Sequence, residues 1–67
     1  MEAKLEFIRK GLAGDIWGLV GPDGLVIRQY PSKTGKEAFE FFKEHAGSLR
    51  DDYKVTSIQF EGETVNL

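Results

Sequence analysis

The sequence contains no cysteine and only one histidine, His45. Disulfides are therefore excluded, and a structural zinc site, which takes four Cys or His ligands, cannot form within one chain. The chain has 67 residues, and a domain of that length buries only about 60% of the surface of its unfolded chain. Natural domains of this size rely on disulfides, a metal or a partner subunit. We therefore expect no cofactor and no metal, and a partner or a second copy remains as the source of added stability.

Long apolar runs are absent as well. The longest stretch without a charged residue, Ile16 to Pro22, is far too short to cross a bilayer. Charged residues at Glu2, Lys4 and Glu6 interrupt the N-terminus, so we recognise no secretory signal. With the absence of cysteine, these features predict a cytoplasmic protein that does not associate with membranes.

Positive charge is not in excess. Nine Lys and Arg residues stand against eleven Asp and Glu residues, which gives a net charge of −2 and disfavours a nucleic acid as partner. Residues 1–36 carry six basic and four acidic residues, whereas residues 37–67 carry three basic and seven acidic residues. Such an uneven distribution can steer a protein toward a charged partner.

A tight hairpin is the clearest structural signal. Pro22-Asp23-Gly24 separates two runs rich in β-branched and aromatic residues, 15–21 and 25–30, which is typical of two strands joined by a turn. The register that follows places Val20 opposite Val26 and Ile16 opposite Tyr30. One face of the hairpin is then expected to carry Trp17, Leu19, Leu25 and Ile27. The other face is expected to carry Ile16, Val20, Val26 and Tyr30, with Gly18 and Arg28 between them.

A helix is predicted after the hairpin, because apolar residues recur there at helical spacing: Phe39, Phe42, Ala46 and Leu49. We expect it to end at Gly47, as a left-handed cap, or to fray on to Arg50, and to cover the face that holds Trp17. Further strands are expected at 4–10, 52–62 with a bulge at 56–57, and 61–67. The order β-β-β-α-β-β predicts one α+β domain over residues 1–67, with an antiparallel sheet and one helix on one face.

The loop that opens the helix allows two interpretations. Thr34 and Glu37 have the spacing of a capping box, in which the threonine hydroxyl accepts a hydrogen bond from the first turn. The loop matches a phosphate-binding P-loop only in Gly35-Lys36, so that motif is not met. Because helix N-termini attract anions, a site for a small anionic ligand such as a nucleotide stays open as the alternative to the cap alone. Its residues would be Ser32, Lys33, Thr34, Gly35 and Lys36.

Catalytic residues are not expected. His45, Ser48 and the pair Asp51-Asp52 contain the residue types of a catalytic triad, but a triad needs a pocket and an oxyanion hole that so small a domain can hardly enclose. On helical spacing His45 borders the core, where an imidazole commonly packs.

The apolar face that no helix can cover carries the functional expectation. A contiguous exposed apolar patch marks an interaction surface. We therefore expect a non-enzymatic protein–protein interaction module: a homodimer, an accessory subunit or an inhibitor of another protein, of the kind typical of accessory and phage genes. The sequence contains no motif that assigns it to a known family. The expected interface residues are Ile16, Gly18, Val20, Val26, Arg28 and Tyr30.

Overall fold

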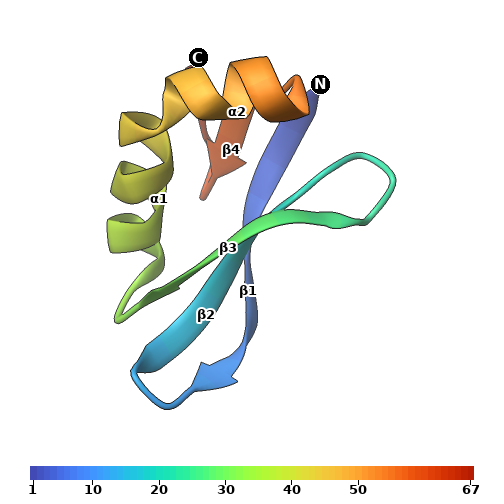
Figure 1. Ribbon diagram of the computed structural model, residues 1–67. Helices are drawn as coiled ribbons and strands as arrows, with labels where there is room; N and C mark the ends of the chain where they lie inside the picture. The colour runs from blue at the N-terminus through green and yellow to red at the C-terminus, as the bar shows by residue number, and fades with distance from the viewer.

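The computed structural model describes all 67 residues. Five strands form one sheet in the order β3-β2-β1-β4-β5, and both helices lie between β3 and β4 in the chain. Figure 1 shows the two helices on the same side of the sheet. The α+β class and the order β-β-β-α-β-β are therefore confirmed. The element bounds are β1 Glu2–Gly11, β2 Gly14–Val20, β3 Val26–Ser32, α1 Gly35–Glu44, α2 Ala46–Tyr53, β4 Ser57–Phe60 and β5 Glu63–Asn66.

The sheet is mixed, where the sequence predicted an antiparallel one. β4 runs parallel to β1, whereas the other neighbouring strands are antiparallel. A parallel neighbour needs a long crossover connection, and β2, β3 and the two helices provide it. As a result β1 lies at the centre of the sheet, and both chain ends lie at the same end of the molecule (Figure 1).

The hairpin of β2 and β3 forms as predicted at its turn, but its register changes after two residues. Gly24 has a φ of 83°, as the turn requires, and Val20 pairs with Val26. A bulge at Ile27 then makes Arg28 the partner of Leu19 and Tyr30 the partner of Trp17. A bulge adds one residue to one strand and so shifts every later side chain by one position.

This shift overturns part of the predicted face assignment. Tyr30 lies on the helix side of the sheet, where its ring stacks on Phe41 with the centroids 3.8 Å apart. Arg28 lies there too, with its guanidinium 5.8 Å from the centre of the Tyr53 ring in α2. Placing these two residues on the uncovered face was wrong. Leu25 does not face the helix either, because it is 67% exposed in the turn.

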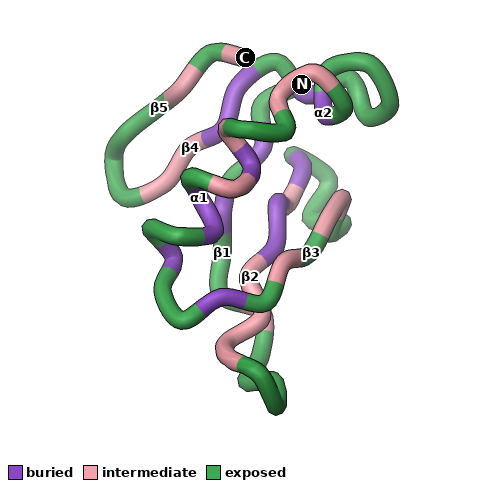
Figure 2. Tube along the Cα trace, turned by 60° about the vertical axis from the view of Figure 1, so that its left-hand side comes forward, coloured by how far each residue is buried: buried purple, intermediate pink, exposed green.

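The core lies between the sheet and the two helices. Figure 2 shows buried stretches in the sheet and in the helices that lie against it. Trp17, Ile27 and Phe60 pack around the core, which confirms that the helix covers the face with Trp17. The buried apolar residues come from three strands, both helices and the segment after α2: Ala3, Leu5, Leu19, Ala38, Phe39, Phe42, Leu49, Val55 and Ile58.

The single predicted helix is divided into two at His45, whose φ and ψ of −104° and 26° lie outside the helical range. Gly47 lies inside α2 and does not cap α1. Helix α2 ends only at Tyr53, because Lys54 adopts a left-handed conformation with a φ of 60°. The strand predicted from residue 52 therefore begins only at Ser57, after a connection at 54–56, and the bulge expected at 56–57 is not found. Neither helix is long and apolar enough to cross a membrane.

Candidate interaction surface

The start of α1 is a side-chain cap, as the sequence predicts. The amide of Glu37 donates to the hydroxyl of Thr34, with 3.2 Å between the nitrogen and the oxygen. Ser32, which is buried, adds two hydrogen bonds: its hydroxyl accepts from the Thr34 amide at 3.3 Å and donates to the Thr34 carbonyl oxygen at 2.7 Å. In the usual capping box the glutamate side chain accepts from the cap amide, and here the Ser32 hydroxyl does so.

Gly35, at the first position of α1, is a packing residue. A Cβ there would lie 2.8 Å from two ring carbons of Trp17 and still closer to the tip of the Phe60 ring. Two aromatic side chains therefore close over the start of the helix, and the role of this glycine is to let them approach the backbone.

A shallow groove of about 440 Å³ runs along α1 beside this cap. Its charged lining consists of three glutamates and one lysine: Glu37, Glu40, Glu44 and Lys36. Lys33, the second lysine of the predicted anion site, is exposed and does not line the groove. Because acidic side chains outnumber basic ones, the groove repels an anion more than it attracts one.

The residues that resemble a triad make other contacts. His45 is exposed; its ring packs on Phe41, with the centroids 4.1 Å apart. Its Nδ1 lies 2.8 Å from the Phe41 carbonyl oxygen, to which it donates. The hydroxyl of Ser48 donates to Asp52 over 3.1 Å. The hydrogen bond from serine to histidine that defines a nucleophile and its base is thus replaced by a bond to a carboxylate.

The sheet face opposite α1 and α2, here called the back face, has no element over it (Figure 1). Four of the predicted interface residues lie on it: Ile16, Gly18 and Val20 of β2, and Val26 of β3. Sequence reasoning missed a fifth residue, Ile8. A Cβ built on Gly18 would lie 3.0 Å from Ile8 and 3.1 Å from Val26, so these two side chains flank the glycine. We call these five residues the apolar patch.

A bulge in β1 explains why Ile8 lies on the back face. The pairing with β2 skips Ile8, because Phe7 pairs with Trp17 and Arg9 with Ile16. Arg9 therefore shares the back face with Ile8, and it crosses β2 to donate to Gln29 over 3.2 Å. The apolar patch is bounded at this end by the bridge from Arg9 to Gln29.

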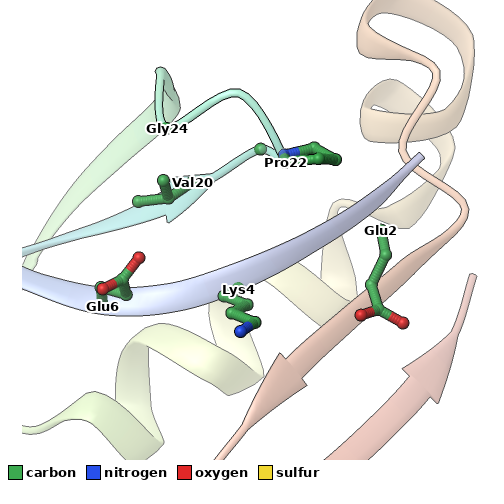
Figure 3. A pocket seen from close by; sticks show the side chains of 7 residues that line it. Glu2, Lys4, Glu6, Val20, Pro22 and Gly24 are labelled. Atoms are coloured by element: carbon green, nitrogen blue, oxygen red, sulfur yellow. The ribbon is translucent and has the colours of Figure 1, made fainter.

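A hollow of about 410 Å³ bounds the other end of the apolar patch. Figure 3 shows Val20, Pro22 and Gly24 on one side of this hollow, and the side chains of Glu2, Lys4 and Glu6 along β1 on the other. Both ends of the patch therefore carry polar or charged side chains, which is the arrangement of an apolar centre with a polar rim found in protein interfaces.

The charged residues of the back face all belong to the central strand, although the Arg9 side chain reaches across β2 to Gln29 of β3. Glu2, Lys4, Glu6 and Arg9 follow one another along β1, with pairing partners at Ser57, Val20, Gly18 and Ile16. The back-face residues of β4 and β5 are uncharged and polar, namely Ser57, Gln59, Thr64 and Asn66. The back face therefore divides into an apolar side over β2 and β3, a charged centre on β1 and a neutral polar side over β4 and β5.

Comparison of the chain with models of protein families, with curated proteins and with solved structures finds no match in any of the three.

Proposed function

We propose that this protein is a non-enzymatic interaction module that binds a protein partner through the back face of its sheet. The observation that carries the proposal is the apolar patch on a sheet face that no element of the chain covers. An apolar sheet surface is stable when it is buried against another layer, and here the helices cover one face of the sheet while the apolar patch lies on the other. A partner would cover the second, as for an accessory subunit, an inhibitor or a homodimer.

The alternative, a small anionic ligand at the start of α1, has less support. The Thr34 hydroxyl and the buried Ser32 hydroxyl are already used within the cap. The adjacent groove carries three glutamates. We propose no catalytic role, because the hydroxyl of Ser48 and the ring of His45 have partners other than each other. We place the module in the cytoplasm, on the absence of cysteine alone.

The test places a charge in the patch. Val26 is 40% exposed, so Val26→Glu should leave the fold intact while it puts a carboxylate in the apolar patch. We expect this variant to lose binding, because a charge buried without a partner is strongly unfavourable. The measurement compares which proteins bind to the immobilised wild type and to the immobilised variant. The molecular mass of the wild type and of the variant in solution is measured as well.

Leu12→Glu is the matched control. Leu12 is fully exposed at the turn between β1 and β2 and is not one of the five patch residues, and the substitution again replaces an exposed apolar side chain with a glutamate. We expect it to bind as the wild type does. Equal binding by wild type and Val26→Glu, with both proteins folded, would contradict the proposal.

A further inference from the structure

We propose that the partner on the back face is a second copy of this chain. The two copies pack face to face about a two-fold axis that lies in the interface and runs perpendicular to β1. This inference rests on the proposed function, because it names the partner of the same surface. Three observations carry it: the order of charges along β1, the symmetry of the uncharged flanks, and the state of the sheet edges.

The charges along β1 form a series that is complementary to its own reverse. Because the bulge at Ile8 lets Arg9 follow Glu6 by one step on this face, the four charges stand at equal steps and alternate in sign. In sequence order they are Glu2, Lys4, Glu6 and Arg9, which reads minus, plus, minus, plus. The reversed strand reads plus, minus, plus, minus, so each charge of one copy meets an opposite charge of the other.

The series also selects one arrangement over another. With the two β1 strands antiparallel, Lys4 of one copy faces Glu6 of the second copy, and Glu2 faces Arg9 of the second copy. With the strands parallel and in register, each residue would face its own counterpart, and all four contacts would join like charges. Complementary charges across an interface fix its register, and juxtaposed like charges suppress the wrong one.

The flanking strands suit the same axis. A two-fold axis perpendicular to the strands places each strand over its own counterpart, so the apolar side over β2 and β3 meets apolar residues and the neutral side over β4 and β5 meets neutral ones. Val20 lies one step along β2 from Gly18, as Lys4 does from Glu6 along β1. Val20 of one copy therefore lies over Gly18 of the second copy and meets the side chains of Ile8 and Val26 that flank this glycine. This is the reciprocal pairing that a two-fold interface requires.

The size of the face agrees with a dimer. The two longer extents of the molecule, 30 and 23 Å, limit any one face to roughly 700 Å², whereas each partner in a standard interface buries about 800 Å². Nearly the whole back face is therefore needed, including β1 with its charges at the centre. Sheets pack about 10 Å apart, a gap that Lys and Glu side chains can span together.

The edges of the sheet disfavour the other common route to a β-sheet dimer. An edge strand binds another strand through its free amides and carbonyls. The edge strand β3 contains Pro31, which has no amide hydrogen to donate. The other edge strand, β5, has only four residues and begins with Glu63. Association through the back face leaves both edges outside the contact.

Charge reversal on β1 tests this arrangement. Lys4→Glu places a second carboxylate against Glu6 of the second copy, twice per dimer, and Glu6→Lys places two lysines together in the same way. Each single variant should weaken the dimer at least about tenfold. The double variant reads minus, minus, plus, plus, which is again complementary to its reverse, so it should restore dimerisation to within about threefold of the wild type.

The measurement is sedimentation equilibrium at micromolar concentration, where the wild type should have twice the 7.5 kDa mass of one chain. The single variants change the net charge in opposite directions and the double variant leaves it at −2, so an effect of net charge alone cannot produce the expected pattern. Lys33→Glu, an exposed charge reversal outside the back face, should dimerise as the wild type does. Circular dichroism confirms that each variant is folded.

Three outcomes are distinguishable. A dimer that the single variants weaken and the double variant restores supports the inference. A wild-type dimer that none of the β1 variants affects, or that the double variant does not restore, overturns the arrangement. A monomeric wild type overturns the second copy as partner. The proposed function still stands if a protein that binds the wild type and Leu12→Glu does not bind Val26→Glu. It falls if both variants bind every protein that the wild type binds.

Discussion

Replacing Gly35 by alanine tests the packing at the start of α1. The added methyl group would enter space that the rings of Trp17 and Phe60 already occupy, with two Trp17 carbons 2.8 Å from its position. The Trp17 ring is held on both sides, because it makes edge contacts with Phe7 and with Phe60, each with centroids 5.8 Å apart. The rings can therefore move away only by breaking contacts of their own.

The expected magnitude follows from two opposing effects. An extra methyl group in a well-packed region costs about 1–3 kcal/mol. Alanine is a better helix former than glycine by up to about 1 kcal/mol. We expect Gly35→Ala to lower the free energy of unfolding by about 1–2 kcal/mol, which is a large share of the roughly 3–10 kcal/mol typical of a 67-residue domain.

Urea unfolding followed by circular dichroism measures this change, and the fluorescence of Trp17, the only tryptophan, reports on the site itself. Gly47→Ala is the matched control. Gly47 also lies in a helix, and nothing lies within 4 Å of the position of its Cβ. The same substitution should therefore raise stability there by about 0.5–1 kcal/mol. If Gly35→Ala were as stable as the wild type or more so, the close approach of the two rings would not limit the residue at this position.

Two further substitutions test the helix ends. Thr34→Ala removes the hydroxyl that accepts from the Glu37 amide and should lower the free energy of unfolding by about 0.5–2 kcal/mol. Thermal melting compares it with Thr34→Ser, which keeps a hydroxyl, and equal melting temperatures of the two variants would contradict the cap. Lys54→Gly should raise stability by about 0.5–1 kcal/mol, because glycine adopts the φ of 60° without strain; a fall in the urea midpoint would show that the lysine side chain contributes more than its backbone conformation costs.

The parts of the fold that depend on neighbouring residues could be predicted from the sequence. The turn at Pro22-Asp23-Gly24, the cap at Thr34 and the element order are each specified by side chains a few positions apart, and all three are present. The bulge at Ile27 could not be foreseen in this way. No glycine or proline marks it, and Leu25-Val26-Ile27 is a continuous apolar run that does not show which residue is the extra one, so Arg28 and Tyr30 were assigned to the wrong face.

The remaining differences have long-range causes. The parallel pairing of β1 with β4 joins residues more than fifty positions apart, and no local pattern specifies it. His45, where the helix divides, is not itself a helix breaker, and the nearby glycine, Gly47, lies inside α2. For the candidate site, four of the six predicted residues lie on the back face. Sequence reasoning did not assign Ile8 to that face. Side chains alternate between the two faces of a strand, so the residue after Phe7 could have been expected on the face opposite to Phe7.

The central position of β1 has a consequence for how the chain folds. β1, which precedes the other strands of this sheet in the chain, receives its second neighbour only when β4 has been synthesised, after both helices. Until then Ala3 and Leu5, both buried in the finished molecule, have only part of their contacts. Contacts between residues far apart in sequence slow folding, because a long loop must close before they form. We expect the pairing of β1 with β4 to be the late, rate-limiting step, and a nascent chain that stops after α2 to leave one side of its central strand unpaired.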